Sequence, residues 1–226
     1  MLSYLLVPLI LISFCFYVYS VYRCRLRTRV LAKAFTSLIF VVISISSYFA
    51  AGSNTHYFVF MLIALSLCTC GDVFLEISQT DELGINYFIY SLSFFFAAHV
   101  AFLTLFCFIS GVSPIDFFAT AAVLALMALV SRLMKLDFLN MDSYVLGYSV
   151  VVAFMLVKSF SLLYGVHGYS ARNILVATGA GLFFASNVIY GFTFFGKKTR
   201  PKLGAASTGI YYAGQVLIAL SVLFAK

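Results

Sequence analysis

Residues 57–75 read YFVFMLIALSLCTCGDVFL, an apolar run with a single charged residue, Asp72. A helix needs about 20 mainly apolar residues to cross the hydrocarbon core of a bilayer. The run therefore predicts a membrane-spanning helix. Asp72 is the carboxylate that the sequence places inside the hydrocarbon layer, where an ionised aspartate costs roughly 2.5–3.5 kcal/mol to insert. A chain that keeps such a residue is expected to use it.

The rest of the chain has the same character, since 64% of its residues are hydrophobic and 9% are charged. Short joints with turn and charge signals separate the apolar stretches, and none of them is long enough for a soluble domain. We predict an all-α, polytopic membrane helix bundle with about eight transmembrane helices, in which residues 1–226 form a single integral membrane domain. The predicted spans lie near residues 2–22, 31–51, 57–75, 86–110, 116–134, 143–164, 173–195 and 207–225.

The net charge of +7 is gathered at predicted membrane edges rather than in a basic domain, so it does not indicate a nucleic-acid partner. If the spans alternate, one side receives most of the basic residues and the other receives only Arg172 and Lys226. The positive-inside rule then predicts cytoplasmic odd-numbered loops and both termini on the far side. The residues of the richer side are Arg23, Arg25, Arg27, Arg29, Lys33, Arg132, Lys135, Lys197, Lys198, Arg200 and Lys202.

Few ionisable residues fall within or beside the spans. Desolvation favours the protonated form of Asp72 unless a cation or donor is near, and such a carboxyl is a ready general acid. His99 lies deep in its span and either hydrogen-bonds to a neighbouring helix or assists Asp72. We interpret Glu76 as a solvated helix end, and Lys158 as a side chain that snorkels to the interface or binds a lipid phosphate. Asp116 follows Pro114 and fits a helix N-terminus.

Two further polar groups lie in the last two spans. Ser186 and Asn187 follow the small-residue stretch at 179–181, which would let another helix approach closely. Tyr211 and Gln215 are one helical turn apart and share a face. We predict a tightly packed bundle whose interior holds four polar side chains: Asp72, His99, Asn187 and Gln215.

The order of these residues resembles the YhhN family of eight-span membrane proteins, which includes the lysoplasmalogenases. The resemblance covers about residues 70–221. It implies hydrolysis of the vinyl ether bond of a lysoplasmalogen, with no metal or organic cofactor, by a protein of the endoplasmic reticulum or plasma membrane. It rests on Gly71, Asp72, Phe88, Phe95, His99, Tyr148, Met155, Gly179, Ala180, Phe183, Ser186, Tyr211, Tyr212 and Gln215.

By this resemblance Asp72 is the acid, and His99 and Asn187 support it. Tyr211, Gln215, Lys158 and Ser186 are the predicted contacts to the lysophospholipid substrate.

The chain departs from the family pattern at Asn187, where the family usually has aspartate, and in two lesser places, Ser91 for glycine and Phe102 for tyrosine. Asparagine has nearly the same shape as aspartate but is neither acid nor base. Two alternatives to a hydrolase therefore stay open: an inactive lipid-binding relative, and a small transporter that uses Asp72 and His99 as a proton relay.

Overall fold

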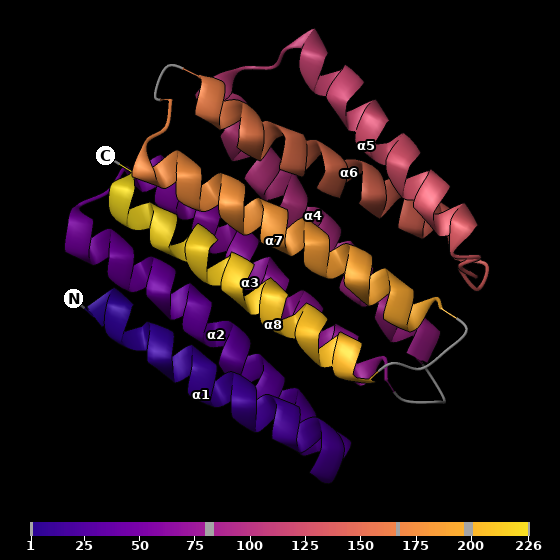
Figure 1. Cartoon of the computed structure of the whole chain (residues 1–226). Coiled ribbons are helices and arrows are strands. Elements are labelled where there is room, and N and C mark those ends of the chain that lie inside the picture. Colours follow the sequence, from indigo (N-terminus) through magenta and orange to yellow (C-terminus); the bar gives the residue numbers. More distant parts are fainter. Residues whose placement is uncertain (1, 80–83, 166–167, 197–200, 226) are drawn as a thin grey trace. The chain divides into compact units, whose positions relative to one another are not determined.

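The computed structural model describes residues 2–79, 84–165, 168–196 and 201–225. Within these residues all regular structure is helical, and eight helices are long and apolar enough to cross a membrane, as predicted. Short 3₁₀ turns, η1 (Leu162–Tyr164) and η2 (Ser221–Phe224), follow two of them. The helices are α1 (Leu2–Arg23), α2 (Leu26–Ala51), α3 (Thr55–Ile77), α4 (Gly84–Ser110), α5 (Pro114–Leu133), α6 (Asp142–Ser161), α7 (Ala171–Phe194) and α8 (Pro201–Leu220) (Figure 1).

The largest difference from the predicted spans is at the start of two helices. α2 begins at Leu26 rather than at residue 31, and α8 begins at Pro201 rather than at residue 207. The basic residues that made the start of α2 look like a loop are helical, and two of them, Arg29 and Lys33, pair with a carboxylate of α3. Lys197, Lys198, Arg200 and Lys226 lie outside the described residues, so the orientation in the membrane stays a prediction.

Contacts divide the chain into two compact units. The first unit comprises Met1–Phe102 and Ile218–Lys226, and the second comprises Leu103–Leu217. That residues 1–226 form a single domain stays a prediction.

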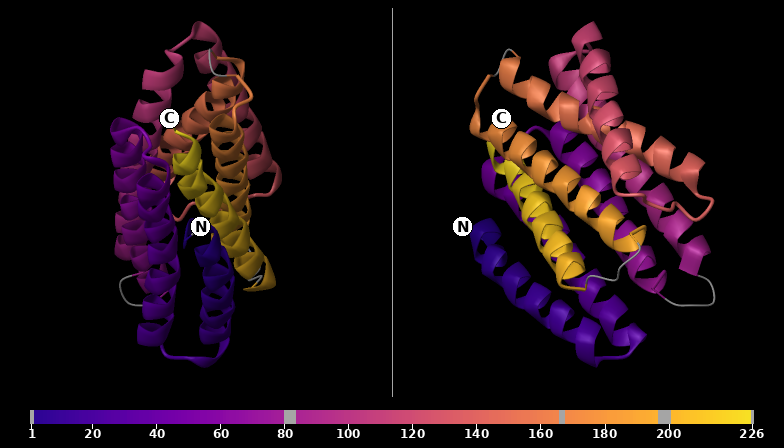
Figure 2. Two further views of the ribbon diagram at one scale, coloured as in Figure 1. Left: turned by 90° about the vertical axis from the view of Figure 1, so that its left-hand side faces the viewer. Right: turned by 45° about the vertical axis from the view of Figure 1, so that its right-hand side comes forward.

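In the first unit, α2 packs against both α1 and α3, and α1 runs antiparallel to α2 (Figures 1 and 2). Phe40, Ile43, Met61 and Leu65 are fully buried in this unit. The 3₁₀ turn η2 contacts the N-terminal end of α3, where the Tyr57 hydroxyl lies 2.7 Å from the Ser221 hydroxyl. This packing fixes the rotation of α2 and α3 about their axes, and so fixes which side chains face each other between them.

In the second unit, α6 lies between α5 and α7 (Figure 1). α5 begins with a capping box: the Asp116 carboxylate accepts a hydrogen bond from the backbone N–H of Ser113, at 2.8 Å. This confirms the prediction that Asp116 stabilises a helix N-terminus.

The small residues of α7 meet a glycine of α8, which confirms the predicted close approach of a helix. A Cβ added to Gly214 would lie 2.7 Å from the Gly179 carbonyl oxygen and 3.1 Å from the Phe183 backbone nitrogen. Both are backbone atoms, so only a shift of a whole helix could relieve the overlap. The Ser207 hydroxyl also donates to the Ser186 carbonyl at 2.8 Å.

We expect Gly214→Ala to lower the free energy of unfolding by about 1–3 kcal/mol, the usual range for overpacking. The better helix propensity of alanine offsets at most about 1 kcal/mol of this. Gly204→Ala is the matched control on the same helix, because nothing lies within 4 Å of its added Cβ. Thermal unfolding in detergent, followed by circular dichroism, should show a loss for Gly214→Ala and none for Gly204→Ala. Equal transitions for the two variants would contradict the close approach.

Candidate functional site

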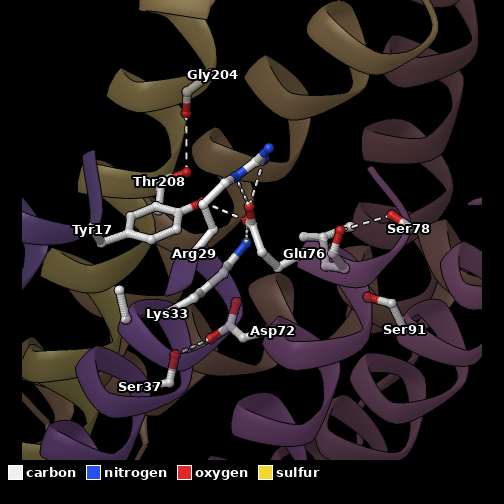
Figure 3. Close-up of polar contacts among 12 residues, drawn as sticks. Tyr17, Arg29, Lys33, Ser37, Asp72, Glu76, Ser78, Ser91, Gly204 and Thr208 are labelled. Carbon is white, nitrogen blue, oxygen red and sulfur yellow. Dashed lines mark hydrogen bonds and ion pairs between the residues drawn. The ribbon is translucent and has the colours of Figure 1, made fainter. Parts of the chain in front are cut away.

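Charged and hydroxyl side chains line the face that α2 turns toward α3. Arg29, Lys33 and Ser37 follow one another at single-turn spacing on α2, and Asp72 and Glu76 are one turn apart on α3. Figure 3 shows the side chains of Arg29 and Lys33 directed toward Glu76, and Ser37 bound to Asp72. The two helices therefore match in register over two turns.

Near the start of α2 and the end of α3, this face forms an ionic cluster around Glu76, which is 2% exposed. Glu76 Oε1 accepts a hydrogen bond from Arg29 Nε at 2.8 Å and forms an ion pair with Arg29 Nη2 at 2.6 Å. Glu76 Oε2 accepts one from the Tyr17 hydroxyl at 2.7 Å and lies 3.5 Å from Lys33 Nζ. Lys33 also lies over the ring of Tyr17, with Nζ 5.6 Å from the ring centre. We call Tyr17, Arg29, Lys33 and Glu76 the charge cluster.

The interpretation of Glu76 as a solvated helix end is wrong. Its carboxylate is buried because α2 brings two cations to it, and a buried charge is tolerated when it is paired and hydrogen-bonded. Asp72 is accordingly not the only carboxylate inside a span: Glu76 and Asp116 are buried as well.

Asp72 lies one turn further from the end of α3 and is 2% exposed. The Ser37 hydroxyl donates to Asp72 Oδ2 at 2.6 Å. The preceding residue, Gly71, allows α4 to approach, because a Cβ there would lie 3.0 Å from the Phe95 ring. The Ser91 hydroxyl donates to the Gly71 carbonyl at 2.9 Å. The backbone at Asp72 is thus held by α4, and its carboxyl by α2.

His99 lies on α4 in the same unit as Asp72 and is fully buried. Its Nδ1 lies 2.5 Å from the Phe95 carbonyl oxygen. A carbonyl can only accept, so Nδ1 carries the proton. In a neutral ring Nε2 is then an acceptor, which suits it to orient water or a proton donor.

Asn187 lies on α7 in the second unit and is half-buried. Its Oδ1 accepts a hydrogen bond from the Tyr148 hydroxyl at 3.1 Å, and its Nδ2 donates to the Phe183 carbonyl at 3.2 Å. The neighbouring Ser186 hydroxyl also bonds to the Phe183 carbonyl, at 2.7 Å. Tyr211 and Gln215 are buried on α8. That Asn187 and Gln215 join Asp72 and His99 in one site stays a prediction.

Lys158 does not snorkel, because it is 1% exposed. Its Nζ lies 2.9 Å from Asp116 Oδ2 and donates to the Gly111 carbonyl at 2.7 Å. This ion pair links α6 to the N-terminus of α5 inside the second unit. Its predicted contact to substrate stays untested, and the structure gives its ammonium group two internal partners.

No group of three or more His, Cys, Asp or Glu side chains in the described part of the chain is placed to hold a metal ion. Cys68 is buried and Cys70 is exposed, so the two cysteines face different sides of α3.

A family model described as the YhhN family matches residues 28–222. The chain belongs to the YhhN family. No curated protein and no solved structure matches it. The match begins well before residue 70, the start of the predicted resemblance, and so takes in Arg29, Lys33 and Ser37 as well as Asp72 and Glu76. Tyr17 lies outside the matched residues.

Two of the expected departures from the YhhN pattern can be located in the structure. Ser91, where the resemblance leads us to expect glycine, donates its hydroxyl to the Gly71 carbonyl. Asn187, where we expect aspartate, accepts a hydrogen bond at Oδ1 and donates one from Nδ2. Asn187 thus acts as donor to a carbonyl, which an ionised aspartate cannot do.

Sequence reasoning did not find Arg29, Lys33 or Tyr17 as members of this site. The single-turn spacing of Arg29 and Lys33, matched by that of Asp72 and Glu76, was an available signal. Alternation of the spans also places the start of α2 and the end of α3 on the same side. Nothing in the sequence marks Tyr17.

Proposed function

We propose that the protein hydrolyses the vinyl ether bond of lysoplasmalogens, releasing a fatty aldehyde and glycerophosphoethanolamine or glycerophosphocholine. The observation that carries this proposal is the Asp72 carboxyl, buried in a span of a YhhN-family chain and oriented by a hydroxyl donor on α2. The proposed setting is the endoplasmic reticulum or the plasma membrane.

Hydrolysis of a vinyl ether starts when an acid delivers a proton to the outer vinyl carbon. The resulting oxocarbenium ion is captured by water, and the hemiacetal that forms collapses to aldehyde and alcohol. In this proposal Ser37 donates to Oδ2, and the proton is carried by Oδ1 of Asp72. After protonation of the substrate, the carboxylate stabilises the cation and takes a proton back from the attacking water. A carboxyl that first donates and then accepts a proton is familiar from glycoside hydrolysis.

His99 suits the second part of this sequence. With its proton on Nδ1, the neutral ring offers Nε2 as an acceptor that orients the attacking water. Asn187 positions water or substrate through its amide and supplies no proton, so the proposed reaction runs with one carboxyl as both acid and base.

The test is aldehyde release from a lysoplasmenyl lipid by the purified protein, with Asn187→Asp beside it. We expect the natural protein to release aldehyde and Asn187→Asp to raise the rate about 10-fold, because a second carboxyl can share the proton transfers. The introduced aspartate can still accept the hydrogen bond from Tyr148. It can donate to the Phe183 carbonyl only when it is protonated, so the increase in rate should be larger at low pH.

An inactive lipid-binding relative is the second candidate, favoured by Asn187 itself, whose amide has a hydrogen-bond partner at each end. No turnover by the natural protein, together with turnover by Asn187→Asp, would support that candidate. If neither protein released aldehyde, the hydrolase proposal would be wrong.

A further inference from the structure

The charge cluster has one more positive than negative group among its own members. Arg29 and Lys33 both lie within 4.0 Å of Glu76. Within the cluster these two cations share the carboxylate of Glu76. A cation in a low-dielectric setting is stabilised strongly by a further anion.

Arg29 is the member of the cluster that a ligand can reach. Its side chain is 22% exposed, whereas those of Lys33 and Glu76 are 5% and 3% exposed. The contacts of Arg29 with Glu76 use Nε and Nη2, both on Oε1. No described residue accepts a hydrogen bond from Nη1, which leaves that amino group to a further acceptor. Arg29 also belongs to the first turn of α2, where the helix dipole favours an anion.

The depth of the cluster suits the head of a lysophospholipid. Glu76 lies in the last turn of α3, and Asp72 precedes it by one turn, about 6 Å along the axis. In a lysoplasmalogen the glycerol unit separates the phosphate from the vinyl ether by a comparable length. The phosphate of a membrane lipid lies at the interface and its vinyl ether lies deeper. A phosphate at Arg29 would therefore bring the vinyl ether to the level of Asp72.

We propose that Arg29, supported by Lys33, binds the phosphodiester of the lysophospholipid substrate and so sets its depth relative to Asp72. This inference rests on the proposed function for the identity of the lipid. Glu76 and Tyr17 hold the two cations in place and do not contact substrate. The phosphodiester carries one negative charge, which the two cations of the cluster attract.

The test compares two uncleavable lipids with the natural protein in detergent. One is a saturated 1-alkyl lysophosphoethanolamine, and the other is the 1-alkylglycerol of the same chain, which lacks the phosphate. We expect the phosphate-bearing lipid to bind roughly 10- to 100-fold more tightly, the size of one charge-assisted hydrogen bond. Arg29→Gln should remove this preference and leave binding of the alkylglycerol unchanged. Native mass spectrometry or thermophoresis gives the dissociation constants.

Arg27→Gln is the matched control, because it removes the same charge from an exposed position two residues away. It should keep the full preference. If Arg29→Gln does not fold, the double variant Arg29→Gln with Glu76→Gln removes both charges of the pair and is measured in its place. Equal binding of the two lipids by the natural protein would overturn the proposal. So would equal weakening of both lipids in Arg29→Gln, or the same loss in Arg27→Gln.

The last measurement is competition by inorganic phosphate. It should not displace the phosphate-bearing lipid at millimolar concentration, and displacement dependent on Arg29 would show a site for soluble phosphate instead. Both lipids lack a vinyl group, so these measurements do not depend on turnover. An Arg29-dependent preference without any aldehyde release would refute the hydrolase and keep the subsite. Aldehyde release without a phosphate preference would support the hydrolase and refute the phosphate subsite.

Discussion

Asp72→Asn is expected to lower the rate of aldehyde release by about 10²–10⁴-fold, the range that a positioned general acid contributes. Asparagine has nearly the same shape and its Oδ1 can still accept the hydrogen bond from Ser37. It cannot donate a proton to a vinyl carbon. The rates of the purified variant and of the natural protein are measured in a coupled assay, in which an aldehyde dehydrogenase reports the aldehyde as it forms.

Two further measurements distinguish the loss of a proton donor from a loss of lipid binding or of the fold. Asp72→Asn should bind the uncleavable alkyl lipid as the natural protein does, because the variant resembles the protonated acid. Ser37→Ala keeps the carboxyl and removes only its donor, so its rate should fall by less than about 10-fold, the worth of one hydrogen bond. A rate of aldehyde release in Asp72→Asn equal to that of the natural protein would show that Asp72 is not the acid. Loss of alkyl-lipid binding would show that the variant is misfolded.

The architecture was predictable because hydropathy and length decide it. Eight apolar runs of spanning length leave the backbone no way to satisfy its hydrogen bonds except as helices. The error in the start of α2 came from the charges of its first turns, which resemble a loop when read alone. Their partner is on α3, and a local pattern contains no information on a partner that far along the chain.

The candidate site was predictable only in part for the same reason. Asp72 and His99 stand out because a polar group deep in an apolar run is costly to insert and is expected to have a partner or a function. Glu76 and Lys158 lie near the ends of their helices, where a solvated or snorkelling side chain is the ordinary interpretation. Both are instead buried against opposite charges, Glu76 against Arg29 and Lys158 against Asp116. Burial of a charge at a helix end follows from the packing of another helix against it.

Glu76→Gln is expected to lower the free energy of unfolding by about 3–5 kcal/mol, the usual effect of removing one partner from a buried ion pair. Glutamine fills the same space and can accept one hydrogen bond from Arg29 or Tyr17. It removes the carboxylate that pairs with buried Lys33 and with partly exposed Arg29. Thermal unfolding of the purified protein in detergent, followed by circular dichroism, measures the change.

The double variant Arg29→Gln with Glu76→Gln separates charge from packing. If the cost of Glu76→Gln comes from the lost ion pairs with Glu76, the second substitution should restore part of the stability, because Arg29 is then removed together with its partner. Asp142→Asn is the control for losing a carboxylate as such: Asp142 is exposed in the first turn of α6, and its loss should change stability by less than about 1 kcal/mol. A change of that small size in Glu76→Gln would mean that the cluster does not stabilise the fold. Its charges would then have to be explained by what they bind, and the measurement on Arg29 would decide that question.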